Sequence, residues 1–378
     1  MSLQKILPRQ LICFVATLML LMTASVCNAQ NDPSDKQEES SATAAGAKEI
    51  KTLQGLIREL ERNESLYANQ KLELTRLYEE FPRHSDPEQQ IRKQWDYSLI
   101  LQGEKFHLEE KSKGRLNNAY IGGRPKQKSL PTSTFSESES IQVFDGTTHR
   151  SLWLSQRETG NPEEPRLVKK SGRISHEYPS LTNYARPHMY FLSSGAPKVP
   201  LSTYLKGIEA VLAYPNPSYV SPGSKIKVQL FDDEEFQGLK CKRLLIDVIL
   251  SSGIRHNGWE LWLARDRNLI PVRNISYTYH WSEEIPVAES TVDEWQEIRH
   301  GVWIPVRFHT DRYNSFIIKR EGKQQLKWRK QEHVKSIKLD PQDLPQDVFT
   351  KLDFPQGTKV SGNDLDNDPD GKAGDADN

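Results

Sequence analysis

The sequence has little cysteine and no excess of charge of either sign. Only three cysteines occur in 378 residues, and two of them, Cys13 and Cys27, lie near the start of the chain. Cys241 then stands alone, which excludes an internal disulfide in the rest of the chain, so burial and β pairing must stabilise it. Lysine plus arginine equals aspartate plus glutamate, 51 each, and this balance argues against a nucleic-acid partner.

Long apolar runs are also lacking, apart from one near the start of the chain. A basic start precedes an apolar run at 11–22, which is too short to span a bilayer and has the length of an export signal. Small residues offer a cleavage site near Ala29. We expect residues 1–29 to be a signal peptide, the protein to be periplasmic or secreted, and no stable transmembrane anchor to remain. A spanning anchor and acylation of Cys27 are the alternatives.

Composition divides the remaining chain into four kinds of segment. Residues 30–46 contain no large apolar side chain, which predicts a disordered leader. Residues 47–360 are expected to form a single domain, with loop-rich excursions at 111–138 and 156–225 where Ser, Pro, Gly, Lys and Arg dominate. Residues 361–378 are acidic and rich in Gly, and are expected to be a disordered tail.

The domain reads as a series of short strands with one apolar and one polar face. Apolar residues between 50 and 67 recur at helical spacing and predict an amphipathic helix, and residues 201–214 predict a second, short helix. Strands follow one another with short turns and no βαβ rhythm, and they include 316–318 and 334–339. The prediction is a mainly β fold. It is an antiparallel incomplete β-barrel (half-barrel), with the N-terminal helix and the second helix packing on its concave face.

Catalytic and metal-binding motifs are lacking. The sequence has no His-Glu-x-x-His pair, no Gly-x-Ser-x-Gly elbow and no Gly-rich phosphate loop, so we expect no catalytic residue, no metal and no cofactor. A hydrolase with a composite site stays open as a less favoured alternative. Asp366, Asp368 and Asp370 match the first half of a calcium loop, and a solvated acidic tail is the competing interpretation. Basic residues around Trp328 are interpreted as part of a solvent-exposed outer strand.

Several sequence segments, in a fixed order, resemble those of a known family. They are Trp262–Arg273, then His300–Pro305, then Val348–Phe349, then Phe354–Val360. With the export signal and the amphipathic helix, this order resembles the periplasmic lipoprotein-carrier (LolA/LolB-like) superfamily, especially its large exported planctomycete-type members. The resemblance implies an incomplete barrel whose cavity shelters acyl chains without catalysis. No residue matches the gating residues of that family.

These observations predict an exported, non-catalytic carrier or sensor of an apolar ligand. The ligand would be a lipid, a lipoprotein acyl chain or another apolar molecule, and an envelope protein is a possible partner. The candidate cavity lining comes from two apolar stripes: Ile275, Tyr277, Tyr279, Trp281, Val302, Ile304 and Phe308. The alternative is a structural or protein-interaction module whose core is filled by its own side chains, because alternating apolar stripes usually form core.

Overall fold

Fourteen strands pair into one open sheet in the part of the chain that the structure describes. This computed structural model describes residues 52–81, 91–117, 133–158, 166–176, 179, 186–189, 199–214 and 223–362. All of them belong to one unit of the chain, 47–378. The predicted signal peptide, the leader and the three aspartates of the acidic tail lie outside the described residues.

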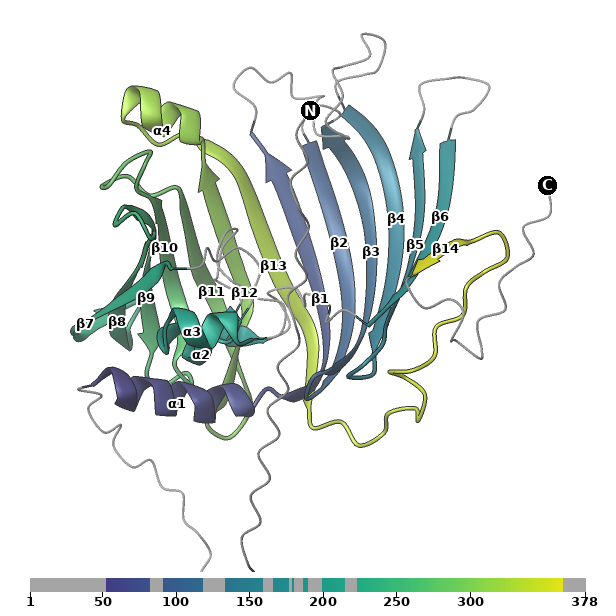
Figure 1. The fold of residues 1–378 in the computed structure, drawn as a ribbon, viewed down its shortest axis with the longest axis horizontal. Helices are drawn as coiled ribbons and strands as arrows, with labels where there is room; N and C mark the ends of the chain where they lie inside the picture. The colour runs from purple at the N-terminus through teal and green to yellow at the C-terminus, as the bar shows by residue number, and fades with distance from the viewer. Residues whose placement is uncertain are drawn as a thin grey trace, which may run out of the picture. The chain divides into compact units, whose positions relative to one another are not determined.

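The sheet consists of two antiparallel meanders joined at their centre (Figure 1). The first meander contains β1 Asn69–Glu80, β2 Ile91–Gln102, β3 Lys105–Asn117, β4 Ser133–Phe144, β5 His149–Glu158 and β6 Arg166–Ser175. The second contains β7 Lys225–Phe236, β8 Leu239–Ile249, β9 Arg255–Ala264, β10 Ile270–Thr278, β11 Ala288–Arg299, β12 Val302–Tyr313 and β13 Leu326–Leu339. Pairing of β1 with β13 joins them, so strands distant in sequence form the middle of the sheet.

The sheet does not close on itself. Its order is β14-β6-β5-β4-β3-β2-β1-β13-β12-β11-β10-β9-β8-β7, so β14 and β7 are its two edges. The short strand β14, Lys359–Gly362, pairs parallel to β6, and every other pairing is antiparallel. The predicted fold class, an antiparallel half-barrel with helices on its concave face, is confirmed.

Helices pack on one end of this sheet. Helix α1, Leu53–Ser65, begins at Thr52, whose hydroxyl accepts a hydrogen bond from the backbone N–H of Gly55 at 3.1 Å. Its apolar stripe contacts the short helices α2, Leu201–Leu205, and α3, Ile208–Leu212, and the strands β8 and β9 in one buried cluster. Figure 1 shows these three helices beside the second meander. The one-turn helix η4, Pro187–Met189, lies against β10.

A second cluster forms the larger part of the core. It joins apolar side chains of β1–β4 with those of β8–β13, and none of its buried members comes from a described helix. The two meanders therefore stabilise each other through side chains of the sheet itself.

Two regions differ from the sequence-based expectation. The expected excursions contain strand: β3 runs to Asn117, β4 starts at Ser133, and β6 lies within the second excursion. Their Ser, Lys and Gly residues suit polar strand faces as well as loops. The strand predicted at 316–318 is wrong, because this segment belongs to helix α4, Ser315–Glu321. The Asn314 side chain accepts from the N–H of Phe316 at 3.1 Å, and Gly322 ends the helix in the left-handed conformation.

Candidate functional site

The helices identify which face of the sheet is the inner, concave one. Leu261 of β9 lies in the cluster formed by α1, α2 and α3. Side chains directly opposite each other in paired strands share a face, so the pairing register extends this face across the whole sheet. One continuous row of partners is Leu244, Leu261, Asn274, Ser290, Thr310, Lys330, Tyr78 and Lys93. We call this face the inner face.

One half of the inner face is apolar. Three successive rows across β1–β4 carry Leu, Phe or Tyr side chains at eight of their twelve positions, and apolar side chains of β11–β13 continue them. The other four positions are Gln70, Glu110, Ser140 and Gln142. Their exposed fractions are 4% or less in the set Leu72, Leu74, Leu99, Leu101, Phe106, Leu108, Phe144, Val292, Phe308 and Val334. These ten side chains form a contiguous apolar region of the inner face, which we call the apolar wall.

The other half of the inner face carries buried or half-buried charge. In this charged band Arg76 pairs with Glu332, whose side chain is almost fully buried, with an Nε–Oε1 distance of 2.8 Å. Arg76 also donates to the hydroxyl of Tyr97 at 3.2 Å. The band further contains Lys93, Glu110, Arg312 and Lys330, which the register places on the same face.

Aromatic rings separate the charges of this band. Tyr78 packs against Trp328 with a centroid distance of 5.7 Å and against Trp95 at 6.3 Å. The ammonium of Lys93 lies 4.7 Å from the centroid of the Trp95 ring, and that of Lys330 lies 5.9 Å from the Trp328 ring. Such cation–π contacts offset part of the cost of removing an ammonium from water.

Burial shifts the pKa values of several side chains in the charged band. Removal from water lowers the pKa of Lys330 and of Arg312, and it raises the pKa of Glu110 and of Glu80. Lys330 retains some exposed surface although protein surrounds its ammonium, as expected for a group deep on a concave face. The environment thus disfavours charge of both signs, and each remaining charge requires a partner.

Three of the seven predicted lining residues come from β12. Phe308 is opposite Val292 and Glu332 and belongs to the apolar wall. Ile304 alternates with it along the strand and is fully buried in the same cluster. Val302 lies farther along β12 and packs with Tyr67 in a small separate cluster.

The remaining predicted residues do not join them on the inner face. Ile275 is opposite Glu260 and Glu289, so it and Tyr277 face away from the helices. Tyr279 follows β10, donates to Asp247 Oδ1 at 2.6 Å and stacks on Tyr277 at 6.1 Å.

Trp281, the seventh predicted lining residue, also follows β10. Its ring packs edge-on against His280 with a centroid distance of 5.0 Å. The expected stripe therefore extends over two faces of the sheet and the turn beyond β10. Only its β12 residues remain candidates for contact with a ligand on the apolar wall.

The charged band is the feature that the sequence reading missed. Trp328 and Lys330 were expected on a wet outer strand, and the structure places both on the inner face opposite Arg312 and Thr310. Alternation continued backwards from the buried Val334 through Glu332 would have assigned them there. The neighbouring Arg329 does face outward, where it binds Asp311 at 2.7 Å.

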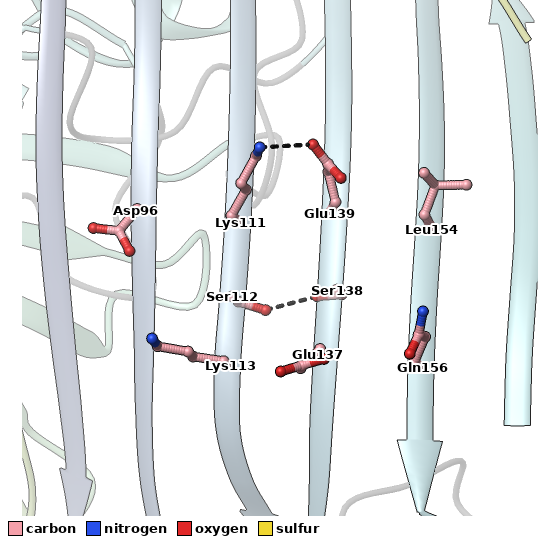
Figure 2. A pocket seen from close by; sticks show the side chains of 9 residues that line it. All are labelled: Asp96, Lys111, Ser112, Lys113, Glu137, Ser138, Glu139, Leu154 and Gln156. Carbon is pink, nitrogen blue, oxygen red and sulfur yellow. Dashed lines mark hydrogen bonds and ion pairs between the residues drawn. The ribbon is translucent and has the colours of Figure 1, made fainter. Parts of the chain in front are cut away.

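A hollow on the opposite, outer face is shown in Figure 2. It has a volume of about 430 Å³ and lies over β2–β5. Lys111 and Glu139 form an ion pair across it at 3.2 Å (Figure 2). Ser112 and Ser138, which are hydrogen-bonded at 2.6 Å, also border it, although the register assigns both to the inner face. Asp96, at its edge, is held by Lys335, Thr75 and Gln94. Its charges are exposed and compensate one another, so this hollow is a solvated sheet surface rather than a ligand site.

Some chemistry can be assessed within the described residues. No group of three or more His, Cys, Asp or Glu side chains is placed there to hold a metal ion. Cys241 is buried, and burial raises the pKa of its thiol to about 12, so it is an unreactive structural side chain. No helix in the same part of the chain is long and apolar enough to cross a membrane.

Comparison with known proteins gives only distant likenesses. The sequence matches no known family profile and no curated protein. A DUF1329 family protein from Desulfovibrio piger is 12% identical with a TM-score of 0.34, covering 79% of this chain and 96% of that one. A putative outer membrane lipoprotein-sorting protein domain from Vibrio parahaemolyticus is 9% identical with a TM-score of 0.35, covering 79% and 95%. A porin-like protein from Bacteroides uniformis is 8% identical with a TM-score of 0.23, covering 71% and 98%.

Proposed function

We propose that this chain is an exported, non-catalytic carrier or sensor that binds a lipid, a lipoprotein acyl chain or another apolar ligand on the concave face of its half-barrel. The observation that carries the proposal is the apolar wall, a contiguous set of apolar side chains on one face of an open sheet. Each CH₂ group transferred from water to such a surface gains about 0.8 kcal/mol, so a long acyl chain needs no catalytic or polar machinery to bind.

The lining proposed for this ligand includes Ile304 and Phe308 of β12, whereas Val302 packs in the separate cluster around Tyr67. A ligand on this face would lie between the two meanders, where both contribute apolar side chains. The predicted export signal places such a carrier or sensor in the periplasm or outside the cell.

One observation favours a second function. The apolar wall is already almost fully buried, which is typical of a core filled by its own side chains. Under this alternative the protein is a structural or interaction module, and an envelope protein is its partner.

Lipid extraction distinguishes the two functions. The mature protein is purified without detergent and extracted with organic solvent, and the extract is analysed by mass spectrometry. Saturable binding of a fluorescent fatty-acid probe is measured in parallel. A carrier yields co-purifying lipid and a displaceable probe, whereas a clean extract together with no saturable probe binding would overturn the proposal.

Charge substitutions locate the ligand. Phe308→Arg on the inner face should abolish probe binding, and Tyr279→Arg on the outer face should leave it unchanged. Because Phe308 is fully buried, its variant can also fail to fold. Trp153→Arg serves as the second variant, since Trp153 lies opposite Ser140 on the inner face and is 44% exposed. Equal probe binding by folded Trp153→Arg and by the wild type would place the ligand elsewhere.

A further inference from the structure

The charged band contains two cations, Arg312 and Lys330, that form no ion pair within the described part of the chain. Arg312 lies in the inner-face row between Ala288 and Trp328, and its side chain is half-buried. Within the described residues its guanidinium has no hydrogen bond and no ion pair, and burial alone lowers its pKa. A buried arginine is normally paired, because its charge is otherwise costly to remove from water.

Lys330 is the second cation. It is opposite Thr310, two residues from Arg312 on β12, so Arg312 and Lys330 are diagonal neighbours on one face. Diagonal neighbours in an antiparallel pair lie roughly 7–8 Å apart, which brings two like charges close together. The carboxylate that acts on Lys330 is Glu332, and Arg76 already binds it.

The remaining acidic side chains do not restore the balance. Glu110 and Glu80 are the other carboxylates that the register places in this band, and burial raises the pKa of both. The register thus places four cations, Arg76, Lys93, Arg312 and Lys330, on the same face as three carboxylates, Glu332, Glu110 and Glu80. The band therefore favours an oxyanion.

The distance along the strands is long enough for a single-chain amphiphile. From Lys93 at the charged band to Leu101 in the apolar wall, β2 spans eight residues, which corresponds to roughly 26 Å at the usual rise of a strand. The hydrocarbon core of a bilayer holds two opposed acyl chains in about 30 Å, so one chain takes about half of that length. One acyl chain is therefore short enough to lie along the apolar wall while its head reaches the charged band. Because the side chains of the wall are 4% or less exposed, the acyl chain must displace what covers them.

We infer that the ligand is a single-chain amphiphile whose anionic head, a carboxylate or a phosphate, is bound between Arg312 and Lys330. A guanidinium offers two parallel N–H groups that match the oxygens of either head group, and a neighbouring ammonium adds a point charge. Trp328 lies between these cations and Glu80 and provides an apolar contact beside the head. This inference rests on the proposed function and specifies its ligand class.

A matched set of ligands tests the inference on the mature wild-type protein. Oleate, oleoyl lysophosphatidate and methyl oleate compete with a fluorescent fatty-acid probe, and inorganic phosphate is added alone. We expect both anionic lipids to bind at least about tenfold more tightly than the uncharged ester. Equal affinity for oleate and methyl oleate would leave the carrier function standing and refute the anionic head. No binding of any lipid would refute both, and phosphate competing as well as lysophosphatidate would identify a site for free anions instead.

Variants assign the head group to its residues. Arg312→Met and Lys330→Met remove the charge and keep an aliphatic side chain, whereas Lys113→Met removes an exposed lysine on the outer face as the control. Each inner-face variant should weaken oleate binding about tenfold and leave methyl oleate binding unchanged. Oleate affinities equal to that of Lys113→Met would contradict the assignment. Thermal unfolding of each variant shows that a loss of affinity does not come from a loss of fold.

Discussion

At the scale of single residues, Asn268 connects segments that are far apart in sequence. Its side-chain oxygen accepts from the backbone N–H of Trp303 at 2.8 Å and from the hydroxyl of Tyr67 at 3.1 Å. Its side-chain amide donates to the carbonyl of Gly301 at 2.9 Å, and its own carbonyl accepts from His188 at 2.7 Å. The end of α1, η4 and two hairpin turns thus meet at one amide.

Replacement of this amide should be costly. Asn268→Ala removes the acceptor of the part-buried Trp303 N–H and places an alanine at a φ of 57°, so we expect a loss of about 3 kcal/mol in the free energy of unfolding. Asn268→Gly tolerates this φ and isolates the contribution of the side chain. Urea unfolding measures both variants. A loss below about 0.5 kcal/mol for Asn268→Ala would show that these hydrogen bonds do not stabilise the fold.

The same residue shows what the sequence could not reveal. The two segments that Asn268 joins could be recognised in the sequence, because the turn after β9 and the Gly-Val-Trp-Ile-Pro segment resemble those of a known family. Their contact was not predictable, since it bridges more than thirty residues and depends on how β10–β12 pair. Local alternation indicates which side of a strand a residue takes, and only tertiary pairing decides what it meets.

At the scale of elements, α1 is held mainly by three side chains. Leu56, Ile57 and Leu60 are buried against α2, α3 and the strands beneath them. Glu64 adds a polar contact by accepting a hydrogen bond from the backbone N–H of Ser202 at 3.1 Å. A helix of this length gains most of its stability from such packing rather than from intrinsic propensity.

Truncation of this stripe tests the contribution of the helix. Leu60→Ala should lower the free energy of unfolding by about 2–5 kcal/mol, because Leu60 is fully buried and its removal leaves a cavity. Arg58→Ala on the exposed side of the same helix is the control and should change it by less than about 0.5 kcal/mol. Chemical denaturation followed by circular dichroism compares the two. Equal effects would show that α1 is not docked through this stripe.

Helices and strands whose apolar residues recur at a regular spacing could be predicted from the sequence, and those without such a spacing could not. The amphipathic helix and the alternating strands of the second meander follow from their apolar spacing. β6 was hidden because its Lys, Ser and Gly residues lack an apolar stripe. The run Phe316–Ile318 is too short for periodicity to separate strand from helix, and the capping by Asn314 and Gly322 decides for helix.

At the scale of the whole molecule, buried histidines connect stability to pH. Burial lowers the pKa of His149 to about 4, with a smaller effect from the nearby Arg173, and burial also lowers the pKa of His188. The unfolded chain binds protons at its histidines below a pH of about 6.5, while the folded protein still resists them. Stability should therefore fall as the pH drops from about 6.5 towards 4.

A single substitution isolates part of this dependence. Because His149 retains some exposed surface, we expect it to account for about 2 kcal/mol of the loss between pH 7 and pH 4. His149→Gln should remove that part and leave the contribution of His188. Urea unfolding of both proteins at the two pH values measures the difference. An identical loss in the variant and in the wild type would exclude His149 as a source.

The half-barrel class was predictable for a whole-molecule reason. The predicted elements are many half-apolar strands and two helices, and their apolar faces cannot stay in water. A sheet that curves around the helices buries these faces. The charged band was not predictable, because its members come from β1, β2, β3, β12 and β13 and gather only through the pairing of β1 with β13.

That pairing also sets an order of assembly. β13 is the last long strand of the chain to be synthesised, and it inserts between β1 and β12 at the centre of the sheet. Until it arrives, the first meander presents β1 as a free edge and the second presents β12, both open to strand addition by other chains. A chain truncated before Leu326 would therefore lack its central strand and expose two unpaired edge strands that are prone to aggregation. Protection by a chaperone matters most before β13 has been added to the sheet.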